Sequence, residues 1–256
     1  MTTNTHLEEW TRSECQENGP RTLVVLPIGA LEQHGPHLPL GTDTILAEHI
    51  ARAAVSQVEK RIPVVVAPSF YYGSSHHHLL HGGTASITTE ALYAALRDVV
   101  TTLLQSKFKS VFIINGHGGN QEIVQLVARD VALTEGVRVA AGSYFHMARP
   151  ALIESGVEDL GELPGHAGAF ETSLMLAARP DLVRLSLAPS REKPEANWPK
   201  GSLYRVGAPG PFRGAAGYSD SPSNADPILG ATMLEACVTA VSMALIEFHG
   251  ENLDTK

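Results

Sequence analysis

Four short runs of apolar residues, rich in valine and isoleucine, stand out along the chain. Glycine, proline or polar residues bound each run. The first three runs are typical of strands that are buried on both faces of a parallel sheet. The predicted strands cover residues 22–31, 62–70, 110–115 and 137–145.

Between and after these runs, apolar residues recur at helical spacing. In residues 43–60, for example, they repeat every three or four positions and so lie along one face of a helix. Thr88 and Thr89 supply capping chemistry for the helix that follows them, and Gly136 closes the next one. The predicted helices cover residues 43–60, 88–107, 119–136, 169–183 and 226–250.

Strands and helices alternate four times, which predicts an α/β sandwich around a mostly parallel sheet. No linker, internal repeat or low-complexity tract divides the chain, so we expect one domain over residues 1–256. Residues 185–225 are rich in proline, serine and glycine and have no clear period. They form either a solvated excursion or a segment that acts as a lid or a subunit contact.

Composition narrows the class of protein. Of the 256 residues, 43% are hydrophobic and 18% are charged, which excludes intrinsic disorder. The net charge of −8 argues against nucleic acid or an anionic membrane as the main partner. The amino terminus lacks the apolar region of a signal peptide, and no stretch reaches the roughly 18 apolar residues needed to span a bilayer. Two cysteines are too few for a disulfide scaffold, so we expect a cytoplasmic protein.

Histidines give the first indication of chemistry, because the chain has 12 of them and most lie beside glycines. Three such segments follow the first three predicted strands: HGPH at 34–37, HHHLLHGG at 76–83 and NGHGGN at 115–120. Ligands of parallel sheets bind beyond the carboxyl ends of the strands. We therefore expect the three loops to converge on one site for metal or proton chemistry. For NGHGGN the alternative is an anion-binding nest, although the lysine of a phosphate-binding loop is missing.

Carboxylates accompany these histidines. Glu32 and His34 leave an extended segment on the same face, and Asp43 follows at the start of a predicted helix. Together they offer oxygen and nitrogen ligands for a divalent cation. Further along, His166 precedes Glu171 by five residues. Glu171 is either a metal ligand or a carboxylate that favours the helix dipole at a helix start.

Four motifs in this order resemble the creatininase family of metal-dependent amidohydrolases: LPIGALEQHGPHLPLGTDT, GSSHHHLLHGGT, INGHGGN and GHAGAFETSLML. The resemblance covers about residues 20–240. It implies a three-layer α/β/α fold, a homo-hexamer, and two adjacent divalent metal ions per chain, with Zn²⁺, Mn²⁺ or Fe²⁺ as candidates. In such sites a hydroxide that bridges the two metals attacks a carbonyl group.

The resemblance also assigns roles to individual residues. Glu32 and His117 resemble ligands of one metal, and His34 resembles a ligand of the other. Asp43 resembles the carboxylate that bridges the two metals. His166 resembles the general acid/base histidine of the family.

The chain departs from creatininase itself in two respects. Creatininase carries a tyrosine and a metal-binding glutamate directly after the strand-end histidine, and Gly118 and Gly119 take their places here. The second metal therefore needs another carboxylate, for which Glu171 is the best candidate. Creatinine-cleaving enzymes also place tryptophans around the substrate, whereas Trp10 and Trp198 lie beside no motif. We therefore do not expect creatinine as the substrate.

Around the metals we expect three residues to contact the substrate, namely Ser75, His78 and Gly118. Ser75 and His78 match the family pattern in GSSHHHLLHGGT. Supporting or surface positions are expected for the remaining loop histidines: His37, His76, His77 and His81.

The leading hypothesis is a dinuclear metal hydrolase that cleaves a C–N bond in a small linear or cyclic amide. One alternative is a ring-opening hydrolase that cleaves a C–C bond in a cyclic keto-sugar or keto-inositol. Another is a peptidase that trims a modified peptide. Outside enzymes, a metal-dependent small-molecule binding protein would not need both a bridging carboxylate and an acid/base histidine.

Overall fold

A computed structural model describes residues 4–157, 163–189 and 217–250. Its sheet is parallel throughout, with the strand order β2-β1-β3-β4. The strands are β1 (Leu23–Ile28), β2 (Val64–Val66), β3 (Ser110–Asn115) and β4 (Val139–Ser143). The helices are α1 (Arg12–Asn18), α2 (Thr42–Val58), α3 (Thr89–Gln105), α4 (Gln121–Glu135), α5 (Tyr144–Met147), α6 (Arg149–Glu154), α7 (Ala169–Ala178) and α8 (Pro227–Gly250).

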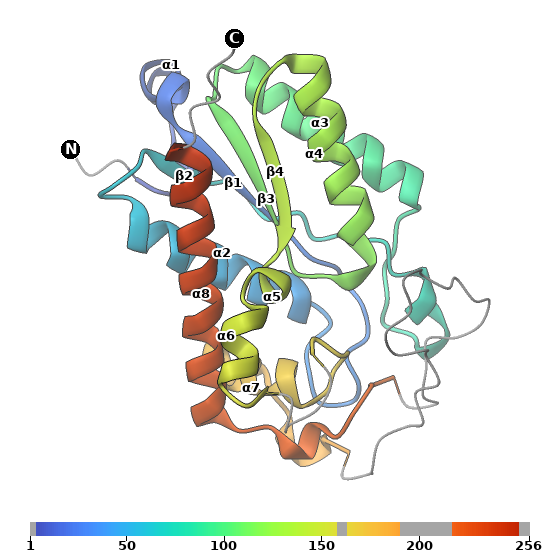
Figure 1. Ribbon diagram of the computed structural model, residues 1–256. Coiled ribbons are helices and arrows are strands. Elements are labelled where there is room, and N and C mark those ends of the chain that lie inside the picture. The colour runs from blue at the N-terminus through green and yellow to red at the C-terminus, as the bar shows by residue number, and fades with distance from the viewer. Residues whose placement is uncertain (1–3, 158–162, 190–216, 251–256) are drawn as a thin grey trace.

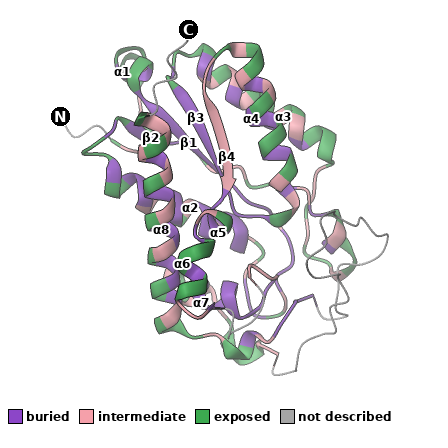
Figure 2. Cartoon of the chain, in the orientation of Figure 1, coloured by how far each residue is buried: buried purple, intermediate pink, exposed green. Residues whose placement is uncertain are grey.

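Helices cover both faces of this sheet (Figure 1). Along β1 the side chains alternate between two apolar clusters: Leu23 and Val25 belong to one, and Val24 and Leu26 to the other. The first cluster includes residues of α2, α5, α7 and α8, and the second includes residues of α3 and α4. Every residue of β1 and β3 is therefore buried (Figure 2). The predicted three-layer α/β/α fold is confirmed.

The strands at the two edges of the sheet are shorter than the sequence predicts. Residues 62–70 were expected to form one strand, but only Val64–Val66 do so, because just three residues pair with β1. The predicted strand 137–145 ends at Ser143, where the chain turns into α5. An edge strand pairs on one side only, so the sheet specifies its ends less strongly than those of a central strand.

The other differences lie in the helices. The predicted helix 169–183 ends at Ala178, because Pro180 lacks the N–H that would continue it. The short helices α1, α5 and α6 were not predicted, since four to seven residues are too few to establish a helical period. At α8 the carboxylate of Asp226 accepts hydrogen bonds from the Ile228 and Leu229 amides and so fixes the helix start.

The helix α8 also differs from the expectation that no segment could span a bilayer. By length and composition it is apolar enough to do so, although 44% of its most apolar window is buried inside the molecule. It packs against α2 and α7. Core helices pass the same test, so this observation is weak evidence for a membrane span.

Two segments that the sequence singled out fall largely outside the described residues. Of the segment 145–165, residues 158–162 are not described, and of 185–225, residues 190–216 are not. Trp198 belongs to the second gap. The expectation that residues 200–225 form subunit contacts therefore stays a prediction.

Candidate metal centre

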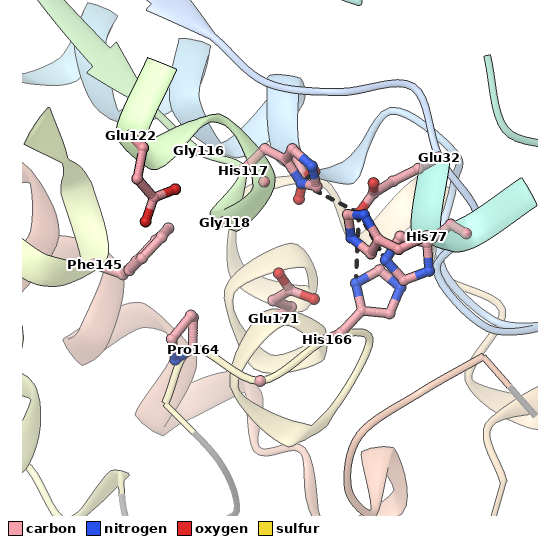
Figure 3. A pocket seen from close by; sticks show the side chains of 14 residues that line it. Glu32, His77, Gly116, His117, Gly118, Glu122, Phe145, Pro164, His166 and Glu171 are labelled. Carbon is pink, nitrogen blue, oxygen red and sulfur yellow. Dashed lines mark ion pairs between the residues drawn. The ribbon is translucent and has the colours of Figure 1, made fainter. Parts of the chain in front are cut away.

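The three histidine-containing loops meet at the carboxyl end of the sheet, as predicted. Glu32 follows β1, His78 lies in the 3₁₀ helix η3 (His76–His81) after β2, and His117 follows β3. Glu32 Oε1 lies 3.5 Å from His78 Nε2 and 3.3 Å from His117 Nδ1. These side chains are almost completely buried, and they line a cavity of about 320 Å³ (Figure 3).

The start of α2 approaches the ends of β1 and β3 closely because small residues stand at the contact. A Cβ atom on Gly116 would lie 2.5 Å from the carbonyl oxygen of Asp43, which no side chain tolerates. The side chain of Asn115 holds the next residue by donating to the His117 carbonyl at 2.7 Å and accepting from its N–H at 3.1 Å. Gly116 and Asn115 thus place the His117 ring against the first turn of α2.

Asp43 joins two groups of side chains. Its Oδ1 lies 3.1 Å from His34 Nε2, and its Oδ2 lies 2.9 Å from His117 Nδ1. We name the two groups after their glutamates. The Glu32 half comprises Glu32 and His117, and the Glu171 half comprises His34 and Glu171. One oxygen of Asp43 faces each half, which is the arrangement expected of a bridging carboxylate.

Backbone carbonyls fix the orientation of the imidazole ring in each half. His34 Nδ1 donates to the Glu32 carbonyl at 3.1 Å, and His117 Nε2 donates to the Ser74 carbonyl at 3.1 Å. Each ring therefore turns its other nitrogen, which can hold a proton or a metal ion, toward the carboxylates. Metal-binding histidines are held in this way in many proteins.

Glu171 combines the two roles that the sequence left open. Its Oε2 accepts a hydrogen bond from the Ala167 N–H at 2.6 Å, just before the first turn of α7. The same oxygen lies 3.8 Å from His34 Nε2, and His34, Asp43 and Glu171 offer ligand atoms that all lie within 4.8 Å of one another. The carboxylate thus supports the helix start and also faces the metal centre.

The pKa values in this cluster reflect three buried carboxylates among imidazoles. Burial alone would raise the pKa of Glu32, but the His117, His166 and His78 rings outweigh it and hold that pKa well below its usual value. Burial and the nearby Asp43 raise the pKa of Glu171 to about 8, against the opposing effect of His34.

The pKa values of His34 and His117 are both raised. Although burial disfavours the charged ring, the Asp43, Glu171 and Glu32 carboxylates raise the pKa of His34 to about 10. Glu32 and Asp43 likewise raise the pKa of His117 well above its usual value. The carboxylates therefore require positive charge, which protons or a divalent cation can supply.

His166 lies beside the Glu32 half from a different part of the chain. Its Nδ1 is 3.5 Å from Glu32 Oε1, and its ring stacks on that of His78 with centroids 4.0 Å apart. Burial and the His34 ring lower the pKa of His166 well below its usual value. A neutral imidazole at the edge of the cavity has a free nitrogen lone pair that can accept a proton.

Comparison with known proteins agrees with this geometry. The family model described as Creatininase, creatinine amidohydrolase, matches residues 8–245. The chain belongs to the creatininase family. The creatinine amidohydrolase of Pseudomonas putida is 30% identical over 93% of this chain and 94% of its own length. A mycofactocin precursor peptide peptidase of Mycolicibacterium smegmatis is 38% identical over 63% of this chain and 60% of its own.

Solved structures and a third relative extend the comparison. A crystal structure of creatininase superposes with a TM-score of 0.80 at 26% identity, covering 98% of this chain and all of that one. Creatininases in a Zn-Zn form and in a Mn form, both 25% identical, give TM-scores of 0.80 and 0.78, each covering 97% of this chain and 100% of the other. A 3-dehydro-scyllo-inosose hydrolase of Thermotoga maritima is 25% identical over 72% of this chain and 59% of its own. Since these relatives are hydrolases, the chain is a metal-dependent hydrolase of the creatininase family.

The structure gives a physical reason why the glutamate of creatininase is missing after the strand-end histidine. A Cβ atom on Gly119 would lie 2.4 Å from the Ser74 carbonyl oxygen and 2.5 Å from His117 Nε2. Any side chain there would displace the hydrogen bond that orients the His117 ring. A carboxylate for the second half must come from elsewhere, and Glu171 is in position.

The predicted substrate contacts fall in different places. Gly118 and His78 line the cavity, and a Cβ atom on Gly118 would meet nothing within 4 Å. Ser75 does not line it. Its hydroxyl lies 3.2 Å from His117 Nε2, on the side of that ring away from the carboxylates, so the structure favours a role in orienting His117 over the predicted substrate contact.

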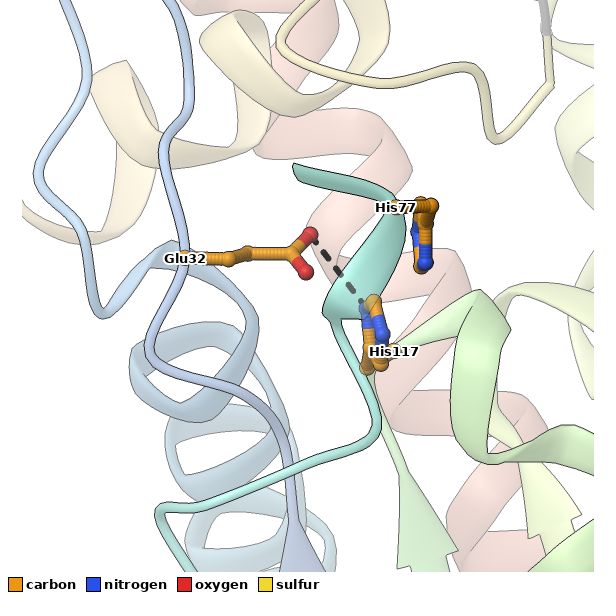
Figure 4. Close-up of side chains that lie close together, drawn as sticks. All are labelled: Glu32, His77 and His117. Atoms are coloured by element: carbon orange, nitrogen blue, oxygen red, sulfur yellow. Dashed lines mark ion pairs between the residues drawn. The ribbon is translucent and has the colours of Figure 1, made fainter. Parts of the chain in front are cut away.

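Two residues near the centre were undervalued by sequence reasoning. His77 offers a ligand atom within 4.8 Å of those of Glu32 and His117, and its ring is nearly parallel to that of His117 (Figure 4). Gln33 contacts both His78 and His166. The run of three histidines gave no way to choose among them, and the neighbours of Gln33 lie 45 and 133 residues away in sequence.

The remaining expected positions agree with supporting roles. His37 Nε2 lies 2.9 Å from the Thr172 hydroxyl, and His76 Nδ1 lies 2.8 Å from the Ser86 hydroxyl. Trp10 packs against Phe108, with ring centroids 6.2 Å apart, at a distance from the cavity lining. Among the described residues no tryptophan lines the cavity.

Proposed function

We propose that this protein is a dinuclear metal-dependent hydrolase that cleaves a C–N bond in a small linear or cyclic amide. The observation that carries the proposal is Asp43, whose two carboxylate oxygens face two separate groups of ligand-type side chains. A single-metal site would need only one of these groups. Two adjacent sites joined by a carboxylate are typical of hydrolases that attack carbonyl groups.

The residues present fit such a cofactor. Both carboxylate oxygens of Glu32 and Oδ2 of Asp43 are buried without a hydrogen-bond donor of good geometry among the described residues. Buried charged oxygens of this kind are costly unless a cation compensates them. The Glu32 half would hold one ion and the Glu171 half the other, with Asp43 shared. When bound, two divalent ions supply an activated hydroxide and polarise a carbonyl group.

His166 is the candidate for proton transfer in this reaction. Its Nδ1 faces Glu32 at the edge of the cavity, while its Nε2 lies 2.9 Å from the Gln33 carbonyl. A neutral ring can accept a proton at Nδ1 while its Nε2–H stays bonded to that carbonyl. It can then deliver the proton to the leaving nitrogen of an amide, which departs poorly as an anion.

The size and lining of the cavity favour a small substrate. Its volume of about 320 Å³ lies at the lower end of the range for small-molecule sites. Phe145 and Glu122 line the side across from His166 (Figure 3). The aromatic wall of tryptophans that the sequence analysis associated with creatinine has no counterpart among the described lining residues. We therefore propose an amide other than creatinine.

Two relatives favour alternatives within the same chemistry. The Thermotoga maritima relative is named a hydrolase of a keto-inositol, and the Mycolicibacterium smegmatis relative is named a peptidase. A ring-opening C–C hydrolase and a peptidase acting on a modified peptide are thus second candidates for the same metal centre.

Protein reconstituted with Zn²⁺ or Mn²⁺ tests these proposals in one screen. We expect two metals per chain by inductively coupled plasma mass spectrometry, and hydrolysis of at least one compound among simple amides, lactams, short peptides and keto-inositols. Turnover of only keto-inositols would replace the C–N proposal with the C–C alternative. A protein that holds no metal after reconstitution would favour a degenerate binding module.

Assembly and location are further proposals. We propose a homo-hexamer, on the strength of the family resemblance, and light scattering that finds a monomer at micromolar concentration would refute it. We also propose a cytoplasmic setting without nucleic-acid or membrane partners. Two cysteines without a disulfide, Cys15 and Cys237, support a reducing compartment.

A further inference from the structure

Gln33 stands between two residues of the metal centre in the chain, Glu32 and His34, yet its own side chain points to other residues. Its amide nitrogen lies 2.9 Å from His78 Nδ1 and 2.9 Å from His166 Nε2. These two rings come from η3 and from the segment before α7, and they are stacked on each other. One side chain therefore contacts both of these stacked rings at the edge of the cavity.

The orientation of the Gln33 amide is determined by its neighbours. Its Oε1 accepts a hydrogen bond from the Gly35 N–H at 3.0 Å, so the NH₂ group must face the two rings. Gly217 packs directly on this amide, since a Cβ atom there would lie 2.2 Å from Gln33 Oε1. The backbone N–H of Gln33 donates to the Thr84 hydroxyl at 3.1 Å, which fixes the main chain at this residue. The amide is thus held in one orientation.

For His78 the consequence is a defined tautomer. The NH₂ group of Gln33 can only donate, so His78 Nδ1 must accept and carries no hydrogen. The proton of a neutral His78 ring is then on Nε2, which lies 3.5 Å from Glu32 Oε1. His78 therefore directs an N–H group toward a carboxylate of the metal centre.

For His166 the same residue offers a partner to either tautomer. Nε2 of His166 lies 2.9 Å from the Gln33 carbonyl, which accepts from an Nε2–H, and 2.9 Å from the Gln33 amide nitrogen, which donates to an Nε2 lone pair. Nε2 can use one partner at a time. A ring that exchanges a proton at Nδ1 while Nε2 carries its hydrogen uses the carbonyl, and a ring with its hydrogen on Nδ1 alone uses the amide nitrogen.

We propose that Gln33 is a positioning residue, which sets the tautomer of His78 and offers His166 Nε2 a hydrogen-bond partner in either tautomer of that ring. This inference rests on the proposed function, in which His166 transfers a proton. The contacts of Gln33 with the two rings do not depend on which substrate is cleaved. Partners of this kind, one step removed from the reacting groups, are typically worth about 10- to 100-fold in activity or metal affinity.

Two substitutions of Gln33 should change the hydrogen bonding of His78 in different ways. Gln33→Leu removes the donor, so His78 Nδ1 and His166 Nε2 both lose the hydrogen bond from the amide. Gln33→Glu keeps the acceptor for Gly35 but replaces the NH₂ group by a carboxylate oxygen, which requires a proton on His78 Nδ1. The matched controls are Gln57→Leu and Gln57→Glu, because Gln57 accepts from the Ser242 hydroxyl near the end of α2 opposite to Asp43.

The measurement is the ¹⁵N spectrum of the histidine ring nitrogens in Zn²⁺-loaded protein, with metal content determined on the same samples. We expect an unprotonated His78 Nδ1 in the wild type and in both controls, and a protonated one in Gln33→Glu. We also expect kcat to fall about 10- to 100-fold in both Gln33 variants, on whichever amide the wild type cleaves.

Two results would overturn the inference. One is a wild-type spectrum with a proton on His78 Nδ1. The other is a set of His78 and His166 signals that is the same in the wild type, Gln33→Leu and Gln33→Glu. A wild type that binds fewer than two Zn²⁺ ions per chain would instead count against the proposed function, so the two failures are distinguishable.

Discussion

The two halves of the metal centre are built in different ways. In the Glu32 half, both residues follow strands that pair directly, since Ile28 at the end of β1 aligns with Asn115 at the end of β3. In the Glu171 half, His34 comes from the loop after β1, but Glu171 comes from α7, which is not part of the sheet. The sheet register therefore positions one half, and helix packing positions the other.

The start of α7 depends on contacts from distant parts of the chain. The carboxylate of Asp220 accepts from the Ala169 N–H at 2.7 Å, and the Ser219 hydroxyl accepts from the His166 N–H at 2.7 Å. These residues follow the longest segment that is not described, 190–216. The position of the Glu32 half therefore follows from the sheet register, whereas that of the Glu171 half also depends on the contacts of Ser219 and Asp220 with the start of α7.

The largest expected effect comes from removing the residue that the halves share. Asp43→Ala should reduce the metal content of reconstituted protein from two ions per chain to nearly none, because one side chain faces both halves. Mass spectrometry of dialysed protein measures this loss directly. His37→Gln is a suitable control, since His37 is buried nearby but bonds to Thr172. Retention of one ion by Asp43→Ala would mean that Asp43 belongs to one half only.

Single-half variants should each cost one ion. His117→Ala should empty the Glu32 half and leave the other, whereas Glu171→Gln should do the reverse. Gln at position 171 can still accept from the Ala167 N–H, so the helix start is preserved while the charge is lost. The metal content of both variants should be about one ion per chain. If Glu171→Gln keeps two ions, the role of Glu171 is confined to the start of α7.

A smaller effect on metal and a specific effect on turnover are expected for His166. His166→Ala should retain both ions and lose roughly 10²- to 10⁴-fold in kcat, the usual contribution of a general acid or base. Steady-state kinetics on a responsive amide, with metal content measured on the same preparation, separates the two properties. Loss of metal as complete as in His117→Ala would make His166 a ligand, and unchanged turnover would remove it from the reaction.

The sequence predicted the elements of the central sheet better than it predicted those that depend on helix packing. Apolar runs located β1 and β3 closely, because central strands are buried on both faces and leave a continuous signal. The edge strands and the short α5 and α6 depend on where pairing and packing stop, which a local pattern does not contain.

In the site, the pattern of strand-end loops predicted that Glu32 and His117 would meet, since adjacent strands bring them together. The placement of Glu171 came from family resemblance and from the absence of another carboxylate. Neither source could find Gln33, whose partners His78 and His166 become neighbours only through tertiary packing. Ser75 was assigned to the substrate because it lies in a motif, but its hydroxyl contacts the far side of His117.

The smallest expected effect is a difference in proton release between the halves. Metal binding requires deprotonated ligands. In metal-free protein the carboxylates raise the pKa of His34 to about 10 and that of His117 well above its usual value, so both rings are protonated near neutral pH. The pKa of Glu171 is about 8, whereas that of Glu32 lies well below its usual value, so below pH 8 Glu171, unlike Glu32, also carries a proton.

Zn²⁺ binding should therefore release about one proton from the Glu32 half and about two from the Glu171 half at pH 6 to 7. Since each released proton makes apparent affinity rise about tenfold per pH unit, the affinity of the Glu171 half should fall more steeply on acidification. Calorimetry in buffers of different ionisation enthalpy counts these protons. Glu171→Gln isolates the Glu32 half and His117→Ala isolates the other. Equal proton counts for the two variants would contradict the electrostatic difference between the halves, even if both bind one ion.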